Sequence, residues 1–355
     1  MNRLESLMGA LPEDVDAALI TTGVNRRYYT GFASSAGTVL ATRKGSWFFI
    51  DSRYYEAAKR VVKSCEVVLQ EKLYQQVSDM LTGQGVRSLA LEGEGVTLRG
   101  FSLWKEKLPE AELRGDNILS GAINRQRSIK SGRELASIQE AQRISDATFA
   151  HILNYIKAGR TERDIALEME FYSRKNGSEG AAFPFIVVSG VNSSLPHGVP
   201  SDKPVEDGDF ITMDFGSIVD GYASDMTRTV AVGRVSDRQR RMYALVLQAQ
   251  LTALEAIRAG AVCREVDARA RDLIDASEFK GSFGHGLGHS LGLDVHEDPR
   301  FSTADETVLE AGMVMSVEPG SYLEGEFGVR IEDIVAVQGD GYHNFCASPK
   351  ELLIL

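Results

Sequence analysis

The segment 209–233, DFITMDFGSIVDGYASDMTRTVAVG, constrains the fold more than any other part of this sequence. Apolar side chains alternate with other residues on both sides of Asp220-Gly221, a pair that favours a tight turn between two antiparallel strands. The apolar side chains of each strand would share one face. Asp214 and Asp225 would therefore lie together on the other face, either directly opposite each other or diagonal.

Two carboxylates that face each other on a sheet repel unless they share a proton or bind a cation. Divalent metal ions prefer carboxylate oxygen, so a metal is the natural partner for Asp214 and Asp225. The alternative is that both are solvated acids on a polar sheet face.

A second informative segment, 282–300 or SFGHGLGHSLGLDVHEDPR, contains His285, His289 and His296, half of the six histidines. His285 and His289 are four residues apart, but the surrounding glycines disfavour a regular helix. The segment is therefore not a helical zinc motif of the HExxH type. Glycine instead allows the backbone to approach a ligand closely. Each histidine alone would more often be structural, but their clustering favours ligands.

Two further acids end strand patterns, Glu318 in MVMSVEPG and Glu332 in GVRIEDIVAV. An inward-facing carboxylate in such apolar runs is costly unless it is paired or binds metal. The alternative to metal binding is an ion pair, for which Arg330 is the candidate partner. A set of four carboxylates and one imidazole suits two hard divalent ions, Mn or Co more than a closed structural Zn site: Asp214, Asp225, His289, Glu318 and Glu332.

The order of predicted elements indicates two domains. Residues from about 15 to 115 alternate short strand patterns with helical patterns, which predicts an α/β domain. A second, α+β unit begins near Arg125 with a long helical pattern that Gly159 is expected to end. Further helices are predicted at 162–175, 238–259 and 266–276, with strand patterns between and after them.

The overall composition excludes several classes of protein. A formal net charge of −11 has the wrong sign for an electrostatic grip on nucleic acid. Apolar runs are far shorter than the roughly 20 residues that span a bilayer, and the N-terminal segment has no signal-peptide core, so a cytoplasmic location is expected. The cysteines, at positions 65, 263 and 346, have no metal-site spacing and are expected to be reduced core residues.

The motifs MDFG, SDMTRT, GHGLGH, VEPG and RIED occur here in one order and spacing. In this the sequence resembles the pita-bread metallopeptidases, which include aminopeptidase P, prolidase and methionine aminopeptidase. The segments NRRYYTGFASSAGTVLAT and FFIDSRYYEAA resemble the N-terminal domain of the proline-specific members. The resemblance implies a pita-bread catalytic domain at 124–355, preceded by a smaller α/β domain at 1–123 of creatinase-like, RNase H-like type.

The resemblance also implies how the ligands divide between two metal ions. Asp214 would bind one ion, Asp225 and Glu332 would bridge both, and His289 with Glu318 would complete the second. Mn is the expected metal, with Co possible and Zn or Fe less expected. Creatinase has this fold without metal and lacks the full ligand set, whereas no ligand departs from the pattern here.

Further residues take roles by the same resemblance. The expected catalytic residues are His197, His296 and Glu318, with Glu318 moving a proton from water to the leaving nitrogen and the histidines stabilising the oxyanion. The expected substrate-binding residues are His197, His285, His296, Arg300 and Arg330. Arg300 would bind the free carboxylate of a dipeptide, or else only hold its loop by a surface ion pair.

The resemblance implies an exopeptidase that uses a metal-bridging hydroxide to cut between an N-terminal residue and proline. Whether it acts as an aminopeptidase on longer peptides or as a dipeptidase stays open. The expected partners are short proline-containing peptides and a second copy of the chain in a homodimer. The alternatives are a non-catalytic binding protein on this fold and a creatinase-like C–N hydrolase.

Overall fold

The computed structural model describes residues 2–355, which separate into two compact units, Met1–Arg127 and Ser128–Leu355. Helix α6 (Ile118–Ser128) extends one residue past this division, and residue 123, after which the boundary was predicted, lies inside this helix. Within the described residues, no helix combines the length and apolar character that crossing a membrane requires.

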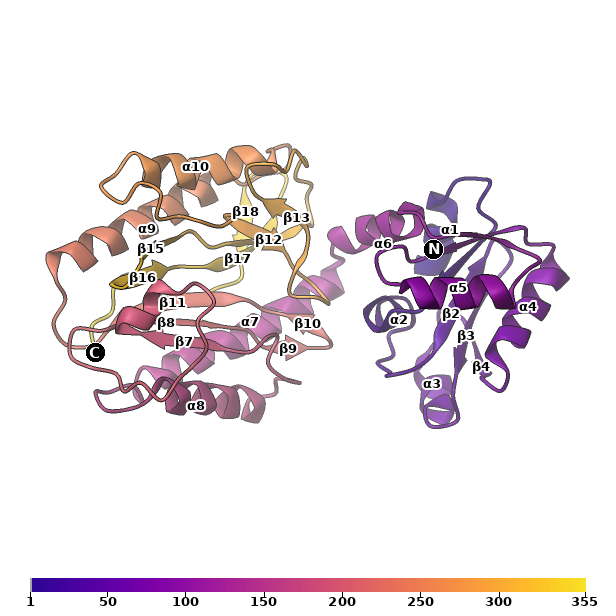
Figure 1. Ribbon diagram of the computed structural model, residues 1–355, viewed down its shortest axis with the longest axis horizontal. Coiled ribbons are helices and arrows are strands. Elements are labelled where there is room, and N and C mark those ends of the chain that lie inside the picture. Colours follow the sequence, from indigo (N-terminus) through magenta and orange to yellow (C-terminus); the bar gives the residue numbers. More distant parts are fainter. Residues whose placement is uncertain (1) are drawn as a thin grey trace. The chain divides into compact units, whose positions relative to one another are not determined.

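The smaller unit is built on one six-stranded sheet with the order β4-β3-β2-β1-β5-β6. Pairing is parallel except between β1 and β2 and between β2 and β3. The strands are β1 (Ala17–Ile20), β2 (Thr38–Thr42), β3 (Ser46–Ile50), β4 (Glu66–Leu69), β5 (Ser88–Leu91) and β6 (Glu112–Arg114). The helices before α6 are α1 (Arg3–Ala10), α2 (Gly23–Thr30), α3 (Tyr55–Val61), α4 (Leu73–Gln84) and α5 (Leu98–Lys107) (Figure 1).

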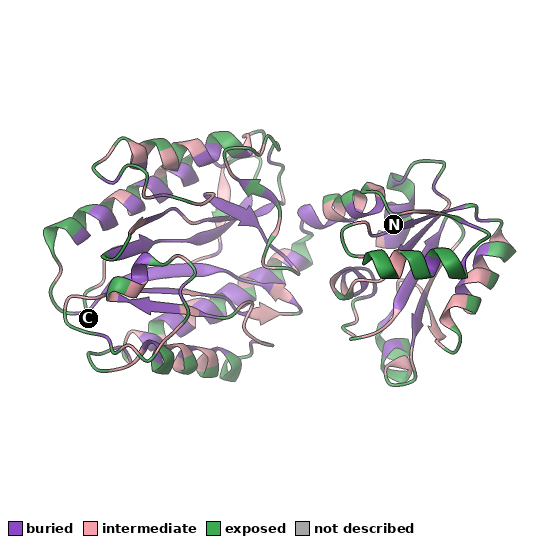
Figure 2. Cartoon of the chain, viewed as in Figure 1, coloured by how far each residue is buried: buried purple, intermediate pink, exposed green. Residues whose placement is uncertain are grey.

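The central strands of this sheet are buried along their length, as an α/β sheet requires. Strand β1 consists of apolar residues, AALI, and all four are buried because β2 and β5 flank it. Figure 2 shows the same contrast between buried strands and partly exposed helices. The α/β prediction for residues 15–115 is confirmed.

The larger unit contains four helices, one 3₁₀ helix and two main sheets, ordered β11-β8-β7 and β13-β12-β14-β17-β18. The helical elements are α7 (Gly132–Ile152), α8 (Glu162–Lys175), η1 (Gly190–Ser194), α9 (Asp237–Glu255) and α10 (Cys263–Asp275). The first strands are β7 (Ile186–Ser189), β8 (Phe210–Phe215), β9 (Ile218–Val219), β10 (Tyr222–Ala223) and β11 (Met226–Ala231). The others are β12 (Gly288–Ser290), β13 (Glu297–Phe301), β14 (Val314–Val317), β15 (Gly320–Leu323), β16 (Phe327–Arg330), β17 (Asp333–Val337) and β18 (Tyr342–Asn344).

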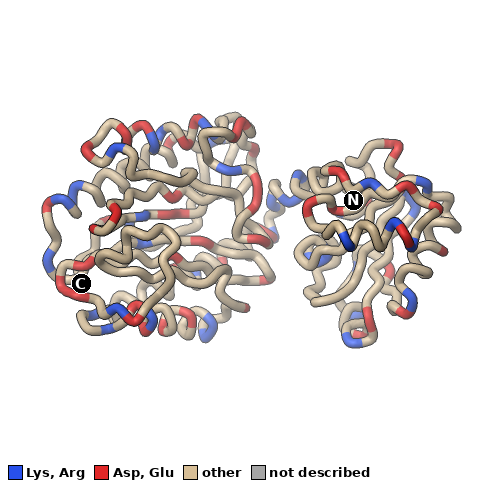
Figure 3. Tube along the Cα trace, in the orientation of Figure 1, with Lys and Arg blue, Asp and Glu red and all other residues tan. Residues whose placement is uncertain are grey.

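Helices cover the outer faces of the strand layer in the larger unit (Figure 1). One apolar cluster joins α7 and α8 to the three-stranded sheet, and another joins α9 and α10 to the five-stranded sheet. Because side chains alternate along a strand, the remaining side chains of both sheets point inward. Figure 3 shows acidic positions within this strand layer as well as on the surface.

The predicted helices of the larger unit are confirmed, but the expected end of the first one is wrong. Helix α7 ends at Ile152, seven residues before Gly159. The amide groups of Asn154 and Tyr155 bond three residues back, to His151 and Ile152, which tightens the chain into turns directly after the helix. Gly159 lies further on, with a φ of 90°.

Candidate metal centre

The hairpin at 209–233 forms as predicted and carries two acids toward the interior. Asp220 and Gly221 both have positive φ, 50° and 83°, and join β9 to β10 by a two-residue turn. Asp214 pairs with Thr227 in the register of β8 and β11, and Asp225 lies two residues before Thr227. Asp214 and Asp225 are therefore diagonal neighbours on one face, one of the two arrangements expected.

The glycine-rich segment forms a short strand, not a helix, and this strand holds His289. A Cβ at Gly288 would overlap the carbonyl oxygen of Ser316, so glycine lets β12 approach β14 closely. The Nδ1 atom of His289 lies 3.1 Å from the Ser290 carbonyl, which acts as acceptor and leaves Nε2 facing the acids. His285 lies in the preceding loop, with Nε2 3.1 Å from the Tyr322 hydroxyl.

Glu318 and Glu332 lie at the ends of adjacent strands. Glu318 directly follows β14 and Glu332 directly precedes β17, and the two strands pair so that Val317 faces Asp333. The Ser316 hydroxyl donates to Glu318 Oε1 at 3.2 Å. The Thr227 hydroxyl donates to Glu332 Oε2 at 2.7 Å.

All ten residues predicted from the sequence for the site line one cavity of about 540 Å³. His289 Nε2 lies 3.3 Å from Glu318 Oε1 and 3.7 Å from Asp225 Oδ2. One ligand-type atom from each of Asp225, His289 and Glu332 lies within 4.8 Å of the other two. Apolar residues form much of the remaining wall: Phe183, Phe185, Ile186, Pro196, Val199, Val295 and Phe301.

The charges in this cluster perturb one another strongly. Burial raises the pKa of both Asp225 and Glu332 well above the ordinary range, and neighbouring carboxylates raise it further. Burial also acts to raise the pKa of Glu318, but the hydrogen bond and charge of His289 outweigh it and lower that pKa to about 2. For His289, burial acts to lower the pKa, yet the hydrogen bond with Glu318 raises it overall.

The acids of this cluster are incompletely satisfied by the protein. Within residues 2–355, three of their buried oxygens have no hydrogen-bond partner: Asp214 Oδ1, Asp225 Oδ1 and Glu332 Oε1. A buried polar atom without a partner costs free energy, and more so when it is charged. A divalent cation would satisfy these oxygens and cancel the mutual repulsion. The residues present therefore fit a site for hard divalent metal ions.

Arg330 forms an ion pair with Asp214. Its Nη2 atom lies 2.6 Å from Asp214 Oδ2, so the alternative in which Arg330 pairs with Glu318 or Glu332 is not the arrangement formed. The guanidinium also donates to the Thr227 hydroxyl, the Tyr322 hydroxyl and the Pro196 carbonyl. Because these protein atoms occupy its donors, Arg330 holds Asp214 and the cavity wall in place.

Two further residues of the site, Thr227 and Tyr322, were not among those predicted from the sequence. Thr227 could have been found, because it lies two residues after Asp225 in an extended segment and so shares its face. Tyr322 lies in β15 and bridges His285 and Arg330 through its hydroxyl. No local pattern distinguishes Tyr322 from an ordinary strand tyrosine.

The remaining predicted residues lie at the open side of the cavity. The exposed ring of His296 contacts His289 edge to face, with 4.4 Å between centroids. Burial lowers the pKa of His296, and the nearby charges of His289 and Arg300 lower it further. The lowered pKa favours the neutral ring. His197 is exposed on the loop after η1. Within residues 2–355, the half-exposed side chain of Arg300 makes one ion pair, at 3.5 Å with the exposed Asp298.

Comparison with known proteins identifies the family. Residues 136–339, which contain the whole acid and histidine cluster, match the family described as Metallopeptidase family M24. The chain belongs to metallopeptidase family M24. This family uses divalent metal ions, in agreement with the acid cluster and its unsatisfied oxygens. Residues 1–129 match the domain described as Creatinase/Prolidase N-terminal domain.

Relatives of this M24 chain match it over nearly its full length. It is 35% identical to the Xaa-Pro dipeptidase of Pyrococcus furiosus, with 99% of each chain covered. The structure of an Xaa-Pro dipeptidase from Bacillus anthracis superposes with a TM-score of 0.96 at 40% identity, covering 99% of each chain. The structure of an X-Pro aminopeptidase from Thermotoga maritima gives a TM-score of 0.92 at 34% identity, covering 99% of this chain and 100% of that one.

Proposed function

We propose that this M24 protein is a dinuclear-metal exopeptidase that hydrolyses the bond between an N-terminal residue and proline. The observation that carries the proposal is the convergence of four acids and His289 on one cavity with three buried carboxylate oxygens unsatisfied. Two divalent ions would satisfy this set, with Mn the preferred metal. The names of the relatives and the apolar cavity wall support a proline-containing substrate.

Each of the two ions would have its own set of ligands. Asp214, whose second oxygen is held by Arg330, would bind one ion. Asp225 and Glu332 would bridge, and His289 with Glu318 would complete the second ion. When bound, the metals would supply a water of lowered pKa and a Lewis acid for the scissile carbonyl.

The chain itself would handle the proton. Glu318 would accept a proton from the attacking water and deliver it to the leaving nitrogen. In the metal-free protein the hydrogen bond and charge of His289 outweigh burial and lower the pKa of Glu318 to about 2. A His289 nitrogen that ligates a metal cannot also donate to Glu318, and the bound cations would then keep Glu318 ionised and ready to accept the proton. Because the acids must be ionised to bind metal, low pH should oppose metal binding.

Histidines at the open side would stabilise charge on the carbonyl oxygen. His296 and His197 would act there as N–H donors, and the lowered pKa of His296 supports a neutral ring that keeps one such donor. His285 would contact the substrate beside Tyr322. When proline follows the cleaved bond, the leaving nitrogen belongs to a tertiary amide with no N–H, so the site must accept the ring without such a donor.

Arg300 would distinguish a dipeptidase from an aminopeptidase. Its exposed side chain lines the cavity, and its ion pair with Asp298 is of the solvent-exposed kind that contributes little. A guanidinium with free donors can bind the carboxylate of a C-terminal proline through two hydrogen bonds. We propose this role for Arg300, whereas Arg330, whose donors are occupied by the protein, would support substrate binding by holding the cavity wall in place.

Two alternatives make different predictions. A non-catalytic binding protein would bind peptides without turnover, and a creatinase-like C–N hydrolase would turn over without metal. The three unsatisfied oxygens favour the metal-dependent peptidase. We also propose a cytoplasmic location, supported by the unpaired state of the three cysteines, and a homodimer, to be tested by sedimentation.

The decisive experiment measures metal and turnover together. Chelated protein is reloaded with Mn, its metal content is determined, and rates are compared on Ala-Pro, Ala-Pro-Ala and the control Ala-Ala. We expect two ions per chain, turnover only of the proline peptides, and loss of turnover on chelation. Reloaded protein without stoichiometric metal would refute the two-metal site, and equal turnover of Ala-Ala would refute proline specificity.

A further inference from the structure

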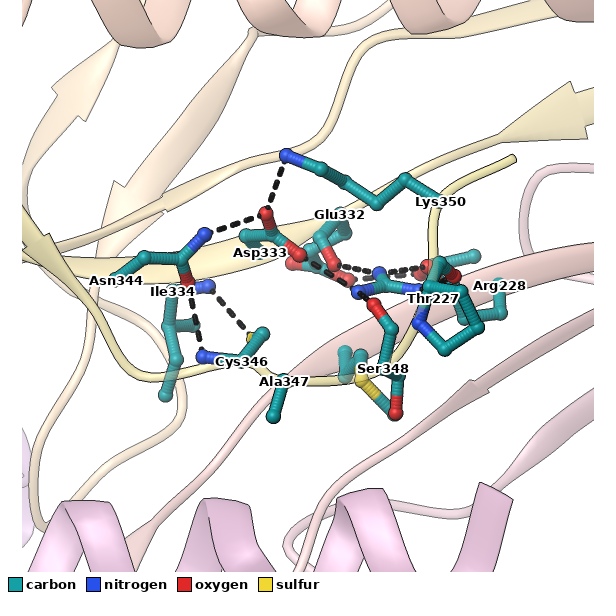
Figure 4. A network of polar contacts seen from close by, with 12 residues as sticks. Thr227, Arg228, Glu332, Asp333, Ile334, Asn344, Cys346, Ala347, Ser348 and Lys350 are labelled. Carbon is teal, nitrogen blue, oxygen red and sulfur yellow. Dashed lines mark hydrogen bonds and ion pairs between the residues drawn. The ribbon is translucent and has the colours of Figure 1, made fainter. Parts of the chain in front are cut away.

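A second charged network lies behind the cavity, on the opposite face of β11 from Thr227 (Figure 4). Its centre is Arg228, whose side chain is only 1% exposed. The guanidinium donates to the Thr227 and Glu332 carbonyls at 2.9 and 2.5 Å and to Asp333 Oδ1 at 2.8 Å. It also donates to the Ser348 and Pro349 carbonyls, at 2.9 and 3.0 Å, so that Arg228 has five acceptors in all.

Asp333 shares its charge between two cations. One carboxylate oxygen accepts from Arg228, and the other accepts from Lys350 Nζ and Asn344 Nδ2, both at 2.8 Å. The Asp333 side chain is 1% exposed, so each of its partners replaces hydration that burial removes. Lys350 belongs to the C-terminal segment 346–355, which lies outside the cavity and takes no part in the mechanism above.

The same network fixes Glu332, a proposed bridging ligand, to the strand that follows Asp225. The Glu332 amide donates to the Thr227 carbonyl at 3.1 Å, and the Glu332 carbonyl accepts from Arg228. Both backbone polar groups of Glu332 are therefore held by β11, and Thr227 holds its side chain as well. Asp225 lies three residues before Arg228 on the same stretch of chain, so its spacing from Glu332 is set by these contacts.

The C-terminal segment is itself anchored where it meets this network. The Asp146 carboxylate on α7 accepts from the amide groups of Ala347 and Ser348, at 3.1 and 2.8 Å. The carbonyls of Ser348 and Pro349 that bind Arg228 are thus held by a second element. Arg228 is braced from the C-terminal side while it holds Glu332 on the cavity side.

We propose that Lys350 and Asp333 are positioning residues for the metal centre, acting through Arg228 to set the separation of Asp225 and Glu332. The inference rests on the proposed function, because it assumes that these two acids bind metal. Loss of the Lys350 ammonium leaves Asp333 Oδ2 with Asn344 alone and frees the carboxylate to rotate. Arg228 follows its partner, and the Glu332 carbonyl loses its fixed donor.

The test is calorimetric titration of metal-free protein with Mn. Lys350→Met is expected to weaken the binding of at least one ion tenfold or more, while circular dichroism stays that of wild type. Lys350→Arg, which restores the cation, is expected to recover most of the affinity. Hydrogen exchange is expected to speed up at the amides of 331–335 in Lys350→Met, a change that does not depend on metal or turnover.

Lys203→Met is the matched control, because Lys203 and Asp209 form a similarly placed ion pair in the same unit. Their side chains are 21% and 14% exposed, against 19% and 1% for Lys350 and Asp333. The control should lose stability without losing Mn affinity. If Lys350→Met does not fold, Asn344→Ala replaces it, because it removes the neutral donor to the same Asp333 oxygen and should weaken Mn binding threefold or more.

The outcomes separate the two proposals. Wild-type protein that binds no Mn would overturn the proposed function, and the positioning role with it. Wild-type protein with two bound ions, together with folded variants of unchanged Mn affinity and unchanged exchange at 331–335, would overturn the positioning role alone. A loss of affinity in Lys203→Met equal to that in Lys350→Met would also overturn it, since the effect would then be one of general stability.

Discussion

Replacing Asp225 with asparagine removes a charge from the acid cluster while almost preserving the side-chain volume. In the metal-free protein this change relieves repulsion from Glu332, Asp214 and Glu318, which burial intensifies. We therefore expect metal-free Asp225→Asn to fold and to have a free energy of unfolding about 1 kcal/mol higher than that of wild type at pH 7. A structural acid in a surface hairpin would give no such gain.

The magnitude of the metal effect follows from linkage. Metal at 100 times its Kd stabilises the folded state by about 2.7 kcal/mol per site. The unit Ser128–Leu355 falls in the size class of about 150–250 residues, for which 1 kcal/mol shifts the melting temperature by roughly 2–4 °C. Wild type should thus gain roughly 5–11 °C from Mn for each site filled. Asp225→Asn should lose at least one such increment and most turnover.

The assay is thermal unfolding with and without Mn, followed by metal analysis and rates on a proline dipeptide. Asp220→Asn is the matched control, because the same substitution then falls in the exposed turn of the same hairpin, where Asn is also favoured. The control should keep the full Mn-dependent shift. An Asp225→Asn protein with both metals and near wild-type turnover would refute the argument from the facing carboxylates.

Three further predictions concern catalysis, substrate length and pH. His296→Ala should lower kcat by about 10²–10³, the cost of one oxyanion donor, while metal content stays intact; metal loss equal to that of His289→Ala would make His296 a ligand. Arg300→Ala should slow Xaa-Pro dipeptides by roughly one to two orders of magnitude and spare longer peptides, and equal losses on both would favour aminopeptidase action. The pKa values of Asp225 and Glu332 lie well above their unfolded values of about 4, a larger effect than the opposite one of the lowered pKa values of His285 and His296, so the folded metal-free protein binds more protons than the unfolded chain. Its melting temperature should therefore rise as pH falls from 8 to 5, whereas the Mn-loaded protein should lose stability because protons compete with metal; a metal-free protein that melts lower at pH 5 than at pH 8 would contradict this.

Local patterns were sufficient to predict most elements of the larger unit. The alternation of residues 209–233 indicated both strands, the turn at Asp220-Gly221 and the shared face of Asp214 and Asp225. The glycines around His289 correctly excluded a helix. The end of α7 was predicted wrongly, because turns after a helix depend on hydrogen bonds that a distant glycine does not control.

By itself, then, the sequence determined which side chains point inward and which of them carry oxygen or nitrogen atoms of the kind that ligate metals, because strand periodicity is a property of neighbouring residues. Only the tertiary structure decided how those side chains pair. Arg330 follows a strand pattern beside Glu332, yet it pairs with Asp214, which is 116 positions away. Lys350 reaches Asp333 only because the C-terminal segment returns behind β17. Such distances are set by the packing of sheets and helices, which no local pattern specifies.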